Sequence, residues 1–317
     1  MLRNYLILMV GLVFFCCQPP KELPDPPGPP LPGAYQMTSY LPLLQSKRVA
    51  VCTNHTGLIG ETHLIDSLMK RGVNVTKVFT PEHGFRGFAD AGEHVEYKEQ
   101  ELPFQLVSLY GQHRKPTADD MENLDVVVFD IQDVGARFYT YISTMTYVME
   151  ACASSGIPFV VLDRPNPNGS YVDGPVLEAE HKSFVGLHPV PIVHGLTPGE
   201  FAQMINGEGW LEGGLRCDLT VISCTDWEHH TRYSLPVRPS PNLPDDHSIA
   251  LYPSLCLFEQ TLCSVGRGTA KAFQHIGHPA YPDTTYFFVP ESLPGAMNPR
   301  FKGEKCFGVD YATDQPV

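Results

Sequence analysis

Apolar positions along the chain follow two alternating periods, and this alternation predicts an α/β fold. Strand-like apolar runs, several of them continuous as in strands covered on both faces, lie at residues 47–52, 73–79, 105–110, 124–129, 157–162 and 217–224. Apolar side chains at helical spacing lie at residues 62–71, 138–152 and 197–206, with Thr62 as the expected N-cap of the first helix. Strands that alternate with helices pair in parallel through crossovers, so the sequence predicts a doubly wound parallel sheet.

Polar motifs punctuated by Gly and Pro follow four of the predicted strands. They read TNHTG (53–57), TPEHG (80–84), DIQDVGAR (130–137) and DRPNPNG (163–169). In a parallel sheet the carboxyl ends of all strands lie along one edge, and ligands bind in the crevice there. We therefore expect these four motifs, far apart in the sequence, to meet at one site.

The motifs that are missing narrow the chemistry of this edge. The sequence contains no G-x-G-x-x-G after the first strand, no P-loop and no G-x-S-x-G. A dinucleotide therefore has no phosphate cradle, and an α/β-hydrolase serine is not expected. The carboxylates, amides, His and Arg of these loops suit a sugar, a divalent metal or both. We predict no cofactor and no resident metal, with a metal-dependent hydrolase that uses Asp130, Asp133 and His83 as an alternative.

Carboxylates in these motifs are candidates for acid–base chemistry. Glu82 lies just past a strand, where burial at a cleft tunes a carboxyl for general acid or base work. A solvated loop glutamate is the alternative. Asp130 and Asp133 bracket Gln132; we expect one of them to cap the following turn, and the other is a candidate second catalytic carboxylate or metal ligand. Glu93 is a further candidate acid, with a solvated loop again as the alternative.

Several other polar residues have two interpretations each. His83 orients Glu82 or binds substrate, and a structural role is equally compatible with the sequence. Arg137 pairs with an anionic substrate group or with Asp133. Asn166 lies among many turn-forming residues, so a structural role in shaping the loop is enough to account for it.

Motifs in the last third of the chain are weaker on their own. Residues 240–244 (SPNLP), which include Asn242, predict a rigid loop. Glu259 is an acid in an apolar setting, where a carboxyl usually has a partner or a function. Arg267 is flanked by glycines that let a ligand approach the backbone. His275 and His278 are spaced for metal binding, but neighbouring prolines favour an irregular loop.

Length and charge restrict the class of protein. The 317 residues fit one large α/β domain or two modest ones, and 43% apolar residues are enough for a core. The net charge of −13 argues against a nucleic-acid or anionic-lipid surface, because both bind basic patches. An enzyme or a binding protein remains.

The first 33 residues predict export. Residues 1–17 form a signal peptide with an apolar core that stops at Cys16 and Cys17, the pattern of a bacterial lipoprotein signal. Residues 18–33 hold eight prolines and predict a stiff tether that does not join a helix or sheet. We expect an exported protein of the periplasm or cell envelope, with a lipid anchor as an open possibility. No two of the seven remaining cysteines are spaced as C-x-x-C. We expect them to be mainly buried free thiols, with one or two disulfides as the alternative.

Long motifs in a fixed order make the chain resemble the exo-β-N-acetylmuramidases of the NamZ type. They include VCTNHTGL (51–58), FTPEHGFRG (79–87), AGEHVE (91–96), SLYGQHRKPT (108–117), DVVVFDIQDVGARFYTYISTM (125–145), IPFVVLDRPNPNG (157–169), GPV (174–176), HGLTPGEFAQMINGEGWL (194–211), SPNLP (240–244), YPSLCLFE (252–259) and SVGRGT (264–269). The resemblance implies a Rossmann-like catalytic domain, placed here at residues 34–235, and a smaller α/β domain at 236–317, with the site between them. The chain stops soon after an R-F-K-G-E-x-C-x-G-V-like motif (300–309), so we expect an incomplete C-terminal domain.

The resemblance also implies an activity and its residues. The activity is release of N-acetylmuramic acid (MurNAc) from the non-reducing ends of peptidoglycan fragments. Glu82 maps onto the family's catalytic glutamate, with Asp133 or Glu93 as the second carboxyl, which in a substrate-assisted reaction only orients the 2-acetamido group. Arg86, Arg137 and Arg267 are candidates to bind the lactyl carboxylate. The full predicted substrate-binding set is Asn54, His83, Arg86, Asp130, Gln132, Arg137, Tyr139, Asn166, Asn242, Glu259 and Arg267.

A muropeptide-binding protein with a lipid anchor and no catalysis is the alternative from another class, because the same edge would bind sugar without cleaving it.

Overall fold

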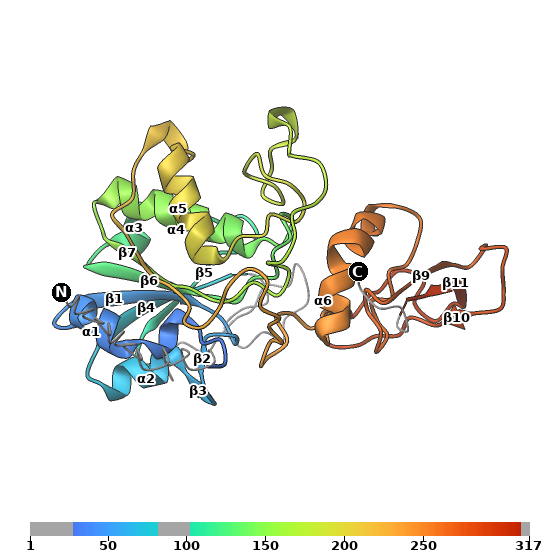
Figure 1. The fold of residues 1–317 in the computed structure, drawn as a ribbon, viewed down its shortest axis with the longest axis horizontal. Coiled ribbons are helices and arrows are strands. Elements are labelled where there is room, and N and C mark those ends of the chain that lie inside the picture. The colour runs from blue at the N-terminus through green and yellow to red at the C-terminus, as the bar shows by residue number, and fades with distance from the viewer. Residues whose placement is uncertain (1–27, 82–101, 312–317) are drawn as a thin grey trace, which may run out of the picture.

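The computed structural model describes residues 28–81 and 102–311 of the chain (Figure 1). Within these residues, no helix is long and apolar enough to cross a membrane. A large sheet with helices on both faces occupies one side of the molecule, and α6 (Asp246–Leu255) with a small sheet occupies the other.

The large sheet is parallel and doubly wound, as the alternating pattern predicts. Its six strands are β1 (Arg48–Thr53), β4 (Asn74–Thr80), β5 (Gln105–Ser108), β6 (Val126–Asp130), β7 (Phe159–Leu162) and β8 (Leu219–Ile222). The spatial order is β5-β4-β1-β6-β7-β8, and all neighbours pair in parallel. The chain leaves β1 toward β4 on one side and returns to β6 on the other. The strand order therefore reverses between β1 and β6, which is where open α/β sheets bind ligands.

Alternation along each strand divides the apolar residues between two cores. Val49 and Val51 of β1 join one core, whereas Ala50 and Cys52 join the other. The first core packs against α1 (Met37–Leu44) and α2 (Leu64–Lys70), and the second against α4 (Tyr141–Ser155) and α5 (Pro198–Glu208). The helices on opposite faces in Figure 1 follow from this period of two.

Capping residues set the helix ends, with one departure from expectation. Thr197 caps α5, and its hydroxyl accepts from the Glu200 backbone while the Glu200 carboxylate accepts from the Thr197 backbone. Thr62 was expected to cap α2, but this prediction is wrong. Thr62 belongs to the two-residue strand β3 (Thr62–His63), which pairs with β2 (Leu58–Ile59). The His63 ring caps α2 instead, because it accepts a hydrogen bond from the Ile65 amide in the first turn of the helix.

The end of the proline-rich stretch is docked on the sheet side of the molecule. Leu31 forms an antiparallel bridge with Thr225, with N–O distances of 3.0 and 2.9 Å. The bridge is isolated, since Thr225 lies beyond the end of β8 (Leu219–Ile222), so Leu31 is docked without joining a sheet. Its prolines lie on either side of it, so its own N–H and C=O remain free to pair next to the edge strand β8.

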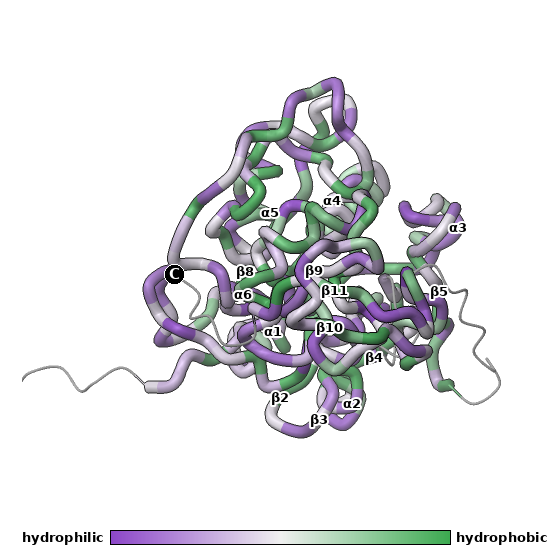
Figure 2. The backbone as a smooth tube through the Cα atoms, turned by 90° about the vertical axis from the view of Figure 1, so that its right-hand side faces the viewer, coloured by the Kyte–Doolittle hydropathy of each residue, from purple (hydrophilic) through white to green (hydrophobic). Residues whose placement is uncertain are grey.

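The C-terminal part combines α6 with an antiparallel sheet in the order β10-β11-β9. These strands are β9 (His275–His278), β10 (Phe287–Phe288) and β11 (Cys306–Asp310). His275 is a core residue here, because its ring stacks on Phe288 and contacts the Tyr286 and Thr269 hydroxyls. Figure 2 looks onto this part, with β9–β11 in front of the large sheet.

The two parts share one apolar core. Tyr252 of α6 packs edge-on against Phe138 and Tyr139, which precede α4. The Asn168 side chain donates to the backbone oxygens of Val134 and Ile249, so a loop of the large sheet holds α6 directly. The smaller elements of the chain are α3 (Ala118–Met121) and the 3-10 turns η1 (Gly33–Tyr35), η3 (Ala179–His181), η4 (Glu212–Gly214) and η5 (Cys256–Gln260).

The cysteines of the described residues are free thiols. Cys52, Cys152, Cys217 and Cys306 are buried, and the other three are partly buried. Burial raises the pKa of the Cys52 thiol, which disfavours the reactive thiolate.

We predict that Phe201→Ala destabilises the protein by about 3–5 kcal/mol. Phe201 is fully buried in α5 against the His188 and His194 rings, so its removal leaves a cavity. Urea unfolding measures the loss. Met204→Ala, an exposed position of the same helix, is the control and should stay within about 0.5 kcal/mol of wild type.

Candidate functional site

Strand register places the predicted motifs on one edge. Thr53 pairs with Asp130 across β1 and β6, and Cys52 pairs with Phe79 across β1 and β4. The segments that follow these three strands therefore begin side by side, at the reversal point of the strand order. The sequence expectation that distant motifs converge is met for 53–57 and 130–137, and 163–169 follows β7 beside them.

A buried ion pair ties this edge together. The Arg164 guanidinium donates from Nε to Asp130 Oδ1 at 2.6 Å and from an Nη to Oδ2 at 3.0 Å. The side chains are 2% and 0% exposed. A further Nη contact reaches the Leu58 carbonyl at 3.2 Å. Asp130 was predicted to contact substrate, but both of its oxygens bind Arg164, so this geometry supports a positioning role instead.

Asn54 and Gln132 form a hydrogen-bonded chain between the β1 and β6 loops. Asn54 Oδ1 accepts from the Thr56 amide at 2.9 Å, and Thr56 Oγ1 accepts from the Gln132 amide at 3.0 Å. Gln132 Nε2 donates to the carbonyls of Asp133 and Pro165. These bonds fix the direction of both amide side chains.

Asp133 is the predicted catalytic residue that the structure describes, and its carboxyl is buried. Its Oδ1 accepts from the Gly135 amide at 2.7 Å, while its Oδ2 is buried without a hydrogen-bond partner. Burial raises the pKa of Asp133 to about 7, against the smaller lowering effect of the backbone amides. A carboxyl poised near neutral pH at the end of a strand is suited to exchange protons there.

Buried polar atoms without a protein partner gather at the same edge. Four of them lie in or beside the segments that follow β1, β4 and β6: Asn54 Nδ2, Thr80 Oγ1, Gln132 Oε1 and Asp133 Oδ2. Buried polar groups normally have partners, and exceptions call for an explanation. Donors and acceptors of this kind suit the hydroxyl and amide groups of a sugar.

Asn166 shapes the neighbouring loop. Its Nδ2 donates to the Leu196 carbonyl at 2.9 Å, and its Oδ1 accepts from the Asn168 amide at 2.8 Å. Gly135 has a φ of +75°, and a Cβ there would lie 2.3 Å from Asn166 Oδ1. Both the Oδ1 and the Nδ2 of Asn166 therefore help to fit two loops together, which supports the shaped-loop interpretation.

Arg137 and Tyr139 also make internal contacts. Arg137 donates from one Nη to the carbonyls of Pro175 and Val190, at 2.7 and 2.6 Å. Burial lowers the pKa of Arg137. The Tyr139 hydroxyl donates to the Pro239 carbonyl at 2.9 Å and links the large sheet to the next segment. Their predicted substrate roles receive no support from these contacts.

The three predicted residues of the last third of the chain hold the C-terminal part in shape. Asn242 Nδ2 donates to the Gly295 carbonyl at 2.8 Å. Glu259 and Arg267 form an ion pair, and Arg267 also lies over the Phe273 ring at 5.1 Å. The Arg267 charge is thus neutralised by Glu259.

Four predicted residues lie outside the described part of the chain. These are Glu82, His83, Arg86 and Glu93. The description ends at Pro81, directly after β4, the strand beside β1. The roles of these four residues stay predictions.

A cavity of about 570 Å³ lies between the large sheet and the C-terminal part. Its lining includes His55, which follows Asn54 at the end of β1, and Arg238, whose carbonyl oxygen lies 2.9 Å from His55 Nε2. The opposite wall comes from Thr269, Ala270, Ala272, Leu293 and Pro294. This volume falls within the range of sites for small molecules.

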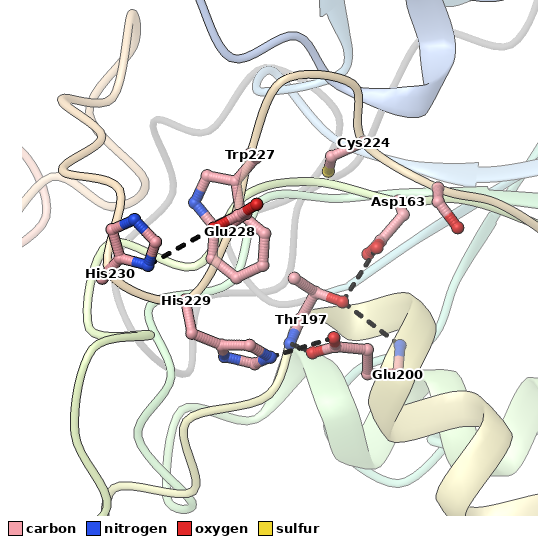
Figure 3. Close-up of a pocket in the computed structure, with 9 residues that line it drawn as sticks. Asp163, Thr197, Glu200, Cys224, Trp227, Glu228, His229 and His230 are labelled. Atoms are coloured by element: carbon pink, nitrogen blue, oxygen red, sulfur yellow. Dashed lines mark hydrogen bonds and ion pairs between the residues drawn. The ribbon is translucent and has the colours of Figure 1, made fainter. Parts of the chain in front are cut away.

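A second pocket of about 450 Å³ lies at the carboxyl ends of β7 and β8 (Figure 3). Its charged groups already have partners: Asp163 accepts from the Thr197 hydroxyl and the Gly199 amide, and Glu200 contacts the His229 ring at 3.1 Å. Burial raises the pKa of Asp163 to about 6. These bonds hold the start of α5, so we assign the functional site to the cavity at β1 and the edge beside it.

Sequence reasoning did not single out Arg164, His55 or Arg238. Arg164 lies within the DRPNPNG motif, and its charge next to a strand end was the available signal. His55 lies within TNHTG. Arg238 precedes the SPNLP motif, and nothing in its local sequence marks it.

Two family models together match most of the residues that the structure describes. One for the N-terminal part of exo-β-N-acetylmuramidase NamZ matches residues 49–247, and one for its C-terminal part matches residues 250–316. The chain belongs to the exo-β-N-acetylmuramidase NamZ family. It is 42% identical over 301 residues to the peptidoglycan β-N-acetylmuramidase NamZ of Bacillus subtilis (strain 168), covering 88% of this chain and 71% of that protein.

Two solved structures share the NamZ-family fold. A DUF1343 family protein of Bacteroides fragilis NCTC 9343, solved at 1.30 Å, is 46% identical, with a TM-score of 0.82, 91% of this chain covered and 78% of that one. A second from the same organism, solved at 1.65 Å, is 32% identical, with a TM-score of 0.78, 89% of this chain covered and 76% of that one.

We predict that Asp133→Asn changes how stability depends on pH. With its pKa near 7, folded Asp133 keeps a proton that the unfolded chain releases near its ordinary pKa of 3.8. Its contribution to stability is therefore fully present below about pH 4 and is lost as pH rises toward 7. The substitution removes this loss, so the variant should gain on wild type from pH 4 to 8, by up to about 4 kcal/mol.

Urea unfolding of both proteins at pH 5 and pH 8 measures this difference. The exposed Asp66→Asn controls for the loss of one charge and should show no such trend. An Asp133→Asn difference that is the same at both pH values would show that the carboxyl is not held neutral by burial.

Proposed function

We propose that this protein is an exo-acting glycoside hydrolase that cleaves the β-glycosidic bond of non-reducing terminal MurNAc in peptidoglycan fragments. The observation that carries the proposal is the NamZ-family match over residues 49–316, together with 42% identity to a curated peptidoglycan β-N-acetylmuramidase. The polar edge of the sheet is consistent with it, because its buried, unpartnered amide and carboxyl atoms suit a sugar.

Two carboxyls would perform the reaction. Glu82 donates its proton to the glycosidic oxygen as the bond to the anomeric carbon breaks. Water then adds its hydroxyl to that carbon, and its remaining proton goes to Asp133 or, where Asp133 only orients the 2-acetamido group, back to Glu82. Asp133 is the second carboxyl: its Oδ2 and its pKa of about 7 suit it to orient the 2-acetamido group or to accept the proton of the water. Glu93 keeps its predicted place as the alternative second group.

The metal-dependent alternative is disfavoured by the partners of Asp130. A metal ligand needs a free carboxylate oxygen, and both Asp130 oxygens bind Arg164. Among the residues that the structure describes, Glu178, Glu180 and His181 bring ligand atoms close together, and all three are exposed.

We therefore expect the glycosidase activity to persist in the presence of a strong chelator.

We also propose export to the cell envelope, with lipid attachment at Cys16 or Cys17. The support is the sequence pattern of residues 1–17 alone, which lie outside the described residues.

The test of the activity uses a MurNAc–GlcNAc disaccharide with products read by mass, and chromogenic β-N-acetylmuramide and β-N-acetylglucosaminide. We expect free MurNAc from the first, colour from the second and none from the third. Glu82→Gln should lower turnover at least about 100-fold, because the amide cannot donate the proton.

The exposed Glu180→Gln is the matched control and should keep full turnover, while circular dichroism checks that both variants fold. Calorimetric binding of the disaccharide without any product would instead identify a binding protein. Full turnover by the Glu82→Gln protein would remove Glu82 from the mechanism.

The test of export is mass spectrometry of the full-length protein expressed in a bacterial host. We expect loss of the first 15 or 16 residues and the added mass of a lipid on the new N-terminal cysteine. Cys16→Ala together with Cys17→Ala should abolish the lipid mass. An uncleaved chain in the cytoplasm would contradict the proposal.

A further inference from the structure

The cavity beside the end of β1 is apolar apart from a few groups. Pro241, Pro244, Leu293 and Pro294 form much of its wall. No carboxylate is among the described residues that line it. The apolar wall suits a small apolar group, and no described carboxylate in the lining would repel an anion.

Arg238 is the one Arg or Lys among the described residues that line this cavity. The backbone carbonyl oxygen of Arg238 contacts the His55 ring, whereas the Arg238 side chain is exposed. Within residues 28–81 and 102–311, the structure records no hydrogen bond or ion pair of its guanidinium. The N–H donors of the Arg238 guanidinium are therefore available to bind both oxygens of a carboxylate.

Three of the motif arginines that the structure describes have partners elsewhere, whereas Arg86 lies outside the described residues. Arg137 binds two backbone carbonyls, Arg164 binds Asp130, and Arg267 binds Glu259. This leaves Arg238 as the described arginine that both lines the cavity and keeps its donors free.

We propose that Arg238 is a specificity-determining residue that binds the lactyl carboxylate of MurNAc, with the surrounding apolar wall receiving the lactyl methyl group. This inference rests on the proposed function. N-acetylglucosamine has a hydroxyl where MurNAc carries the lactyl ether, so it offers neither the charge nor the methyl. The cavity would thus discriminate between the two sugars of peptidoglycan by one charged contact and one apolar contact.

The test compares two chromogenic substrates, the β-N-acetylmuramide and its analogue with a neutral carboxamide in place of the lactyl carboxylate. Wild type should favour the carboxylate substrate. Arg238→Met should lower kcat/KM for the carboxylate about 10- to 100-fold and leave the carboxamide within about threefold, because a charge-assisted bond contributes only with the charged ligand. Arg238→Lys should recover part of the preference, since it restores the charge without the fork.

Arg232→Met is the matched control, because it removes the same charge from an exposed position six residues earlier that does not line the cavity. It should preserve the preference of wild type. Equal losses on both substrates, or no loss on either, would overturn the role of Arg238 while leaving the glycosidase intact.

Calorimetry with free MurNAc gives a readout that does not depend on turnover. Wild type should bind MurNAc more tightly than N-acetylglucosamine, and Arg238→Met should lose this difference. Absence of cleavage by wild type with this binding pattern retained would reject the proposed hydrolysis but keep the Arg238 contact.

Discussion

Arg164 and Asp130 place two opposite charges inside the fold, at the carboxyl ends of adjacent strands. Removing water from both groups costs free energy, and the two-pronged hydrogen bond between them offsets that cost only in one geometry. The same guanidinium reaches Leu58 in the segment after β1. One pair therefore fixes three loops relative to one another, and the amide chain of Asn54 and Gln132 is built on this frame.

The second part of the chain depends on that frame as well. Tyr139 and Asn168, both from loops of the large sheet, hydrogen-bond to backbone oxygens at Pro239 and Ile249. Tyr252 then continues the core of α4 and α5 into α6. Because these contacts join rigid elements, the cavity between the two parts has defined walls.

The proposed contact with Arg238 would let an acidic protein bind an anionic sugar through a local positive charge. The net charge is −13, yet the lining of the cavity includes Arg238 and no described carboxylate. Arg164 and Arg267 instead pair with Asp130 and Glu259, which neutralises charges inside the fold. Asp133 is the opposite case, a carboxyl whose charge is disfavoured by burial, and it lies where acid–base chemistry is proposed.

The sequence by itself determined the doubly wound sheet and the edge where polar motifs meet, because strand periodicity and strand ends are local properties. The resemblance carried by its long motifs named the family and Glu82. Only the tertiary structure decided which polar residues are free. Asp130, Asn166, Glu259 and Arg267 have the same side chains as substrate-binding residues would, but folding gives them internal partners. Arg164 binds Asp130 from 34 positions away, and the Leu196 carbonyl accepts from Asn166 across 30 positions. Glu259 and Arg267 pair with each other. Arg238 became a candidate for the complementary reason: folding brings it to the cavity at the end of β1 and gives its side chain no recorded partner there.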